Sequence, residues 1–73
     1  MQKYANTNGD SGVESFEIHE SYIIVKFKGT YKTYKYSYQS AGQSHVETMK
    51  QLALAGNGLN AYIKHHVNSK YVR

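Results

Sequence analysis

Tyrosine and lysine are the residues of this chain whose types and spacing point most directly to chemistry. The 73-residue chain has eight tyrosines, two phenylalanines and no tryptophan. Lysines are interleaved with several of these tyrosines over residues 22–38. Tyrosine rings stack on exposed bases, and lysine ammonium groups attract phosphates. The pattern therefore favours binding of a single-stranded nucleic acid, provided that these side chains share an exposed face.

Alternation with a period of two decides which of these side chains share a face. We expect strands over residues 22–28 and 31–38, because apolar and polar residues alternate there. Ile23, Val25 and Phe27 would lie on the buried face, with Tyr34 and Tyr36 beside them. The opposite face would carry the candidate nucleic-acid-binding residues Tyr22, Lys26, Lys28, Tyr31 and Lys35.

The sequence leaves three interpretations of this second face open. The first is the nucleic-acid surface described above. The second is a solvated outer face whose lysines protect the sheet from edge pairing. The third is a contact with a second copy of the chain or with a larger protein, made by the apolar cluster of Tyr22, Ile24 and Tyr31.

The charge distribution supports an anionic partner. Residues 1–20 hold one lysine and four acidic residues, a local sum of −3, whereas residues 21–73 hold eight basic residues and one acidic residue, a local sum of +7. A basic body attracts polyanions through its long-range field. Lys64, Lys70 and Arg73 would extend the candidate nucleic-acid interface along the C-terminal part of the chain.

The order of the patterns predicts an α+β fold, because strands follow one another first and helices come afterwards. Strands over residues 13–19, 22–28 and 31–38 would form a three-stranded antiparallel meander with two short helices on one face. Ser44 and Glu47 fit a capping box that opens the first helix, and Gly56 would end it. The second helix would bury one side of residues 59–67. Residues 1–12 are polar and would form a flexible tail before a single domain at 13–73.

Two short motifs resemble a known family. The segment from Gly56 to Lys64 is similar to the closing motif of the KTSC domain, and Tyr34-Lys35-Tyr36 matches the Tyr-x-Tyr motif of that family. The opening strand of the family matches Ser11, Val13, Ser15 and Ile18. The resemblance covers about residues 11–70 and implies a short module that occurs at the C-terminus of some lysyl-tRNA synthetases and as free-standing small proteins. It implies RNA as the preferred nucleic acid.

Other possible sites are weaker. The turn Gly56-Asn57-Gly58 precedes a helix N-terminus and would suit an anion such as a nucleotide, although a glycine turn between two helices explains the same residues more simply. His65 and His66 point about 100° apart on a helix and do not form a metal pair. The chain has no cysteine and no recognisable catalytic motif. We therefore expect no enzyme activity, no cofactor and no metal.

The leading hypothesis is a non-catalytic module that binds RNA or another nucleic acid through a basic, tyrosine-rich sheet face. The alternatives are a protein-interaction or inhibitor protein, encoded by a phage or another mobile element, that docks on a larger enzyme, and a binder of a nucleotide-type anion. A homodimer is compatible with each of these hypotheses. The longest apolar run, Tyr22 to Val25, is far too short for a membrane span. With no apolar N-terminal segment, we expect a cytoplasmic protein.

Overall fold

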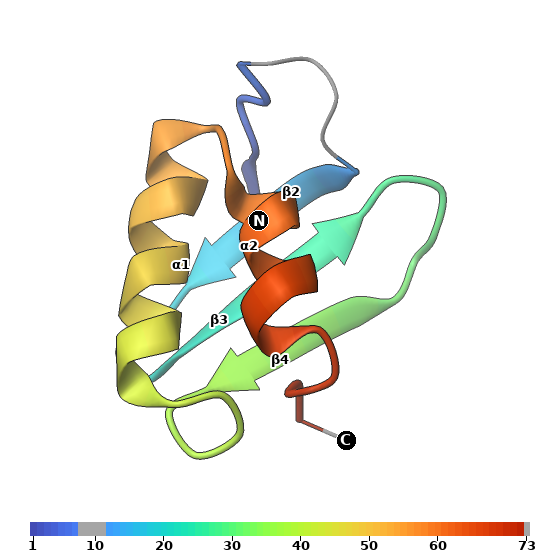
Figure 1. Ribbon diagram of the computed structural model, residues 1–73. Helices are drawn as coiled ribbons and strands as arrows, with labels where there is room; N and C mark the ends of the chain where they lie inside the picture. Colours follow the sequence, from blue (N-terminus) through green and yellow to red (C-terminus); the bar gives the residue numbers. More distant parts are fainter. Residues whose placement is uncertain (8–11, 73) are drawn as a thin grey trace.

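One antiparallel sheet, in the order β1-β2-β3-β4, carries the helices on one of its faces (Figure 1). The computed structural model describes residues 1–7 and 12–72. The α+β class and the meander are confirmed, but the described residues form four strands rather than the predicted three. The elements are β1 (Gln2–Lys3), β2 (Val13–Ile18), β3 (Tyr22–Phe27), β4 (Thr33–Ser37), α1 (Gln43–Ala55), α2 (Leu59–Tyr62) and the π-helical turn η1 (Ile63–Val67), which continues α2.

The additional strand comes from the segment that was predicted to be a flexible tail. Gln2 lies opposite Phe16 in the register of β1 and β2. Tyr4, which follows β1, is only 2% exposed, and its hydroxyl accepts a hydrogen bond from the Leu59 N–H at 3.3 Å. A strand of two residues has no periodicity to detect, so the sequence pattern does not reveal it. The remaining part of the predicted tail, residues 8–11, lies outside the described residues.

The helices cover the sheet face that the alternation predicted. Ile23 and Val25 are fully buried, and Tyr36 is 1% exposed. The opposite layer contributes buried side chains at helical spacing: Val46, Met49 and Ala53 from α1, and Leu59, Ile63 and Val67 from α2 and η1. Burial of these two matching apolar faces holds the two layers together.

The two ends of α1 form differently. The predicted capping box is wrong, because α1 begins at Gln43 after Gly42 and has no side-chain cap. The Glu47 carboxylate instead accepts hydrogen bonds from the Tyr38 hydroxyl at 2.5 Å and from Lys50 Nζ at 2.8 Å. Both hydrogen bonds lower the pKa of the Glu47 carboxyl, and the one from Lys50 has the larger effect. The predicted C-terminus is confirmed, because Gly56 has φ 79° and donates its N–H to the carbonyls of Leu52 and Ala53 in the last turn of the helix.

Tyr36 should make the fold sensitive to alkaline pH. Burial, followed by the nearby Tyr34 and Tyr71, raises the pKa of Tyr36 to about 12, from an ordinary value of 10.0. The contribution of this tyrosine to stability is therefore complete below pH 10 and is lost as the pH rises towards 12. We expect Tyr36→Phe to move the midpoint of alkaline unfolding, followed by circular dichroism, to higher pH. The exposed-site variant Tyr31→Phe is the control, and equal midpoints in the two variants would refute this assignment.

Candidate nucleic-acid interface

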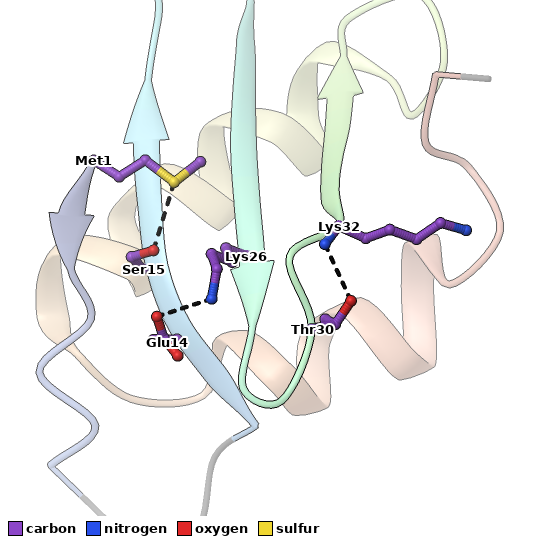
Figure 2. A network of polar contacts seen from close by, with 6 residues as sticks. All are labelled: Met1, Glu14, Ser15, Lys26, Thr30 and Lys32. Atoms are coloured by element: carbon purple, nitrogen blue, oxygen red, sulfur yellow. Dashed lines mark hydrogen bonds and ion pairs between the residues drawn. The ribbon is translucent and has the colours of Figure 1, made fainter.

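The sheet face opposite the helices is open, and the strand register decides which side chains meet on it. Figure 2 shows this face with the helices behind the sheet. Neighbouring residues of β2, β3 and β4 form rows across the face. The rows are Ser15–Lys26–Thr33 and Glu17–Ile24–Lys35, and Tyr22 lies beside Ser37 in the next. The predicted residues Tyr22, Lys26 and Lys35 are therefore brought together on one face.

Two glutamates share this face with the lysines. The Lys26 ammonium lies 2.9 Å from the Glu14 carboxylate. A dashed line in Figure 2 marks this ion pair. Glu14 lies at the irregularity in the β2–β3 register between Val13 and Ser15. Alternation along the strand therefore does not predict on which face of the sheet its side chain lies. Glu17 lies 2.9 Å from His19, whose hydrogen bond lowers the pKa of Glu17. The centre of the face is therefore of mixed charge rather than uniformly basic.

Tyr22 already has partners within the fold. The His19 ring stacks on it, with centroids 4.4 Å apart and an angle of 18° between the planes. The Lys35 ammonium lies 4.1 Å from the centre of the Tyr22 ring. Cation–π contact of this kind stabilises the lysine against the ring. Tyr22 and Lys35 therefore form a pre-arranged cluster, and a base would have to displace one of these contacts to stack on this ring.

Tyr31 is in a different position. It lies in the loop between β3 and β4 and is 97% exposed. Gly29 turns the chain with φ 81°, and Thr30 Oγ1 accepts the Lys32 N–H at 3.0 Å. Lys28 is also exposed, and the Lys32 side chain extends outward from the loop in Figure 2. The loop therefore presents one free ring between two lysines.

Two hollows lie beside this loop. One of about 410 Å³ is lined by Tyr31, Lys26 and Glu14 together with the turn. Another of about 280 Å³ is lined by Lys3 and Lys28, among others. Sequence reasoning missed Lys3, because it lies in the predicted tail. We use the name basic loop end for the group made of Lys3, Lys26, Lys28, Tyr31 and Lys32.

The remaining predicted residues lie elsewhere. Lys64 is an exposed residue of η1, and Lys70 follows that turn. Lys64 belongs to the helical layer, which covers the other face of the sheet (Figure 1). Lys70 lies in the C-terminal segment that leads to β4, where the Val72 N–H donates to the Lys35 carbonyl at 2.6 Å. Arg73 lies outside the described residues. The structure therefore does not bring Lys64 together with the lysines of the open face.

The predicted anion-binding turn, Gly56-Asn57-Gly58, packs against the N-terminal segment. The Gly56 carbonyl accepts the Thr7 N–H at 2.8 Å. The first N–H of α2, that of Leu59, donates to the Tyr4 hydroxyl. These contacts give the turn a structural role and occupy the Leu59 N–H, one of the donors at the start of α2 that an anion would use.

Histidines meet in a combination that the sequence did not suggest. His45 Nδ1 lies 2.7 Å from the Tyr62 hydroxyl, and the His45 and His66 rings stack with centroids 5.7 Å apart.

Within residues 1–7 and 12–72, no three His, Cys, Asp or Glu side chains gather as a metal site. In the same part of the chain, no helix has the length and apolar character needed to cross a membrane.

Fold and site together define a small α+β domain with an open sheet face of mixed charge and a basic loop end. Comparisons with models of known families, with curated proteins and with solved structures found no match. The resemblance to the KTSC family therefore stays a prediction from the motifs at residues 34–36 and 56–64.

Proposed function

We propose that this chain is a non-catalytic module that binds single-stranded nucleic acid, RNA in preference, through the basic loop end. The observation that carries the proposal is the 97% exposure of Tyr31 between Lys28 and Lys32. A large aromatic ring that is exposed to water lacks the favourable free energy that burial of its surface would provide. Stacking on a base recovers it, with a contribution of about 1–3 kcal/mol for each base.

The charges around Tyr31 suit a phosphate backbone. Within the described residues, Lys3, Lys28 and Lys32 form no ion pair with a carboxylate, whereas Lys26 is neutralised by Glu14. Among the described residues, the loop end therefore has three lysines without a carboxylate partner, and two of them, Lys28 and Lys32, flank the exposed ring of Tyr31 in the chain. Three phosphate contacts to a single strand correspond to a slope of log K against log salt of about −2.

The ring provides the sharpest test. We expect Tyr31→Ala to weaken binding of a fluorescent 12-nucleotide single-stranded RNA roughly 5- to 150-fold, as loss of one stacked base implies. Tyr31→Phe should retain most of the affinity, because stacking uses the ring and not the hydroxyl. Fluorescence anisotropy at low salt measures both variants, and the salt slope is recorded for each.

Lysine variants separate charge from stacking. Lys28→Ala combined with Lys32→Ala should reduce the salt slope, whereas Tyr31→Ala should leave it nearly unchanged. Lys64→Ala combined with Lys70→Ala also removes two positive charges, away from the loop end, and is the matched control. Equal losses from this double variant and from the loop variants would exclude a local interface. The same titrations with single-stranded DNA and duplex RNA test the preference for RNA, which rests on the family resemblance.

A further inference from the structure

We propose that the open sheet face binds a second copy of this chain, with the two sheets face to face about a two-fold axis parallel to β3. The central row of the face runs from Glu17 on β2 through Ile24 on β3 to Lys35 on β4. The row therefore has an acidic residue on β2, an apolar residue on β3 and a basic residue on β4. When a second copy is rotated by 180° about β3, its basic residue faces the acidic residue of the first copy, and a two-fold interface requires a self-complementary surface of this kind.

The axis parallel to β3 pairs opposite charges. Facing sheets pack about 10 Å apart. This rotation places β2 of one copy over β4 of the other, so Glu17 faces the partner's Lys35, and the contact occurs twice. Ile24 and Tyr22 lie along the axis and meet their own copies, which adds apolar contact at the centre. The stack of His19 on Tyr22 and the approach of Lys35 to the same ring hold these side chains in place beforehand.

A second face-to-face arrangement, with the two-fold axis perpendicular to the strands, is disfavoured by the charges of Glu17 and Lys35. An axis perpendicular to the strands would place β2 over β2, so Glu17 would face the partner's Glu17 and Lys35 the partner's Lys35. Both contacts are repulsive. Among the residues of β2, β3 and β4, the one like-charge approach in the favoured arrangement is that of Lys26 to its copy, and each Lys26 ammonium is already 2.9 Å from a Glu14 carboxylate. These groups therefore meet as neutral pairs.

The size of the face sets the expected strength. Three strands of five or six residues cover roughly 14 Å by 20 Å, or about 300 Å² for each copy. Two copies would together bury about 600 Å², which is below the roughly 1,200 Å² of standard specific interfaces, so we expect a weak and reversible dimer. Association should therefore become visible at high protein concentration.

The favoured axis also has a consequence for binding. Rotation about an axis along the strands keeps both β3–β4 loops at the same end of the dimer, so the two copies of Tyr31 lie side by side. If the loop end binds nucleic acid, the dimer would follow a strand about twice as long. This consequence rests on the proposed function, whereas the dimer itself does not.

Sedimentation equilibrium without nucleic acid tests the dimer with charge exchanges. Glu17→Lys and Lys35→Glu should each weaken self-association at least about 10-fold, because each creates two like-charge contacts. An equimolar mixture of the two variants should dimerise again, since every exchanged charge then faces its opposite. The double variant Glu17→Lys/Lys35→Glu should also dimerise. Circular dichroism of each variant confirms that the monomer folds, and Glu17→Gln, which adds no repulsion, should give an intermediate loss.

The result that overturns the proposal is a wild-type chain that stays monomeric at about 1 mM protein, a concentration at which association with a Kd of about 1 mM or tighter is visible. Single exchanges that associate as well as the wild type would overturn it too. Lys28→Glu provides the separation from the proposed function. It lies at the loop end and should weaken nucleic-acid binding without weakening self-association. Loss of dimerisation with Lys28→Glu would place the interface at the loop and not on the sheet face.

Discussion

Replacing Tyr4 with alanine is expected to destabilise the domain by about 3–5 kcal/mol, the usual cost of removing a large buried ring. Tyr4 is only 2% exposed and packs edge-on against Phe16, with ring centroids 6.4 Å apart. Its hydroxyl also accepts the first N–H of α2. A domain of this size has a free energy of unfolding of roughly 4–11 kcal/mol. The variant should therefore be largely unfolded at moderate urea concentration.

Urea unfolding followed by circular dichroism measures this loss, and two further variants divide it. Tyr4→Phe keeps the ring but leaves the buried Leu59 N–H without its acceptor, so it should cost less than Tyr4→Ala, about 1–3 kcal/mol. Deletion of residues 1–7 removes both β1 and the ring, and should be at least as damaging as Tyr4→Ala. A deletion that unfolds at the wild-type urea concentration would mean that the N-terminal segment is a tail after all.

The contrast between Tyr4 and the central strands shows what periodicity can predict. Residues 22–28 alternate over enough positions for Ile23 and Val25 to be assigned to the buried face by their spacing alone. Alternation in the next strand places Tyr36 on the same side, and its burial confirms the assignment. The two residues of β1 are too few for a period, so Tyr4 is a lone aromatic residue in a polar segment.

The candidate site was predictable only within one strand at a time. Alternation placed Tyr22, Lys26 and Lys35 on the open face, which the register confirms. It did not place Glu14 and Glu17 beside them, because that neighbourhood depends on the pairing of β2 with β3 and on the irregularity near Val13. The exposure of Tyr31 depends on the loop rather than on strand alternation.

Gly56→Ala should be the most damaging of the glycine substitutions within the described residues. Gly56 has φ 79°, and a Cβ built on it would lie 2.6 Å from the Cβ of Ala5. The left-handed backbone costs a residue with a Cβ about 1–2 kcal/mol, and forcing extra volume into a packed contact costs about 1–3 kcal/mol more. We therefore expect a loss of about 2–5 kcal/mol, the sum of these two costs, measured by urea unfolding.

Gly58→Ala separates these two causes, because it has the same backbone but not the same crowding. Its φ is 82°, and the nearest atom to its added Cβ is Leu52 Cδ2 at 3.6 Å, an ordinary contact. It should therefore cost only the backbone part, about 1–2 kcal/mol. Adding Ala5→Gly to Gly56→Ala removes the clashing methyl group and should recover part of the loss. Equal losses from the two glycine variants, with no recovery from Ala5→Gly, would mean that the N-terminal segment does not pack on this turn.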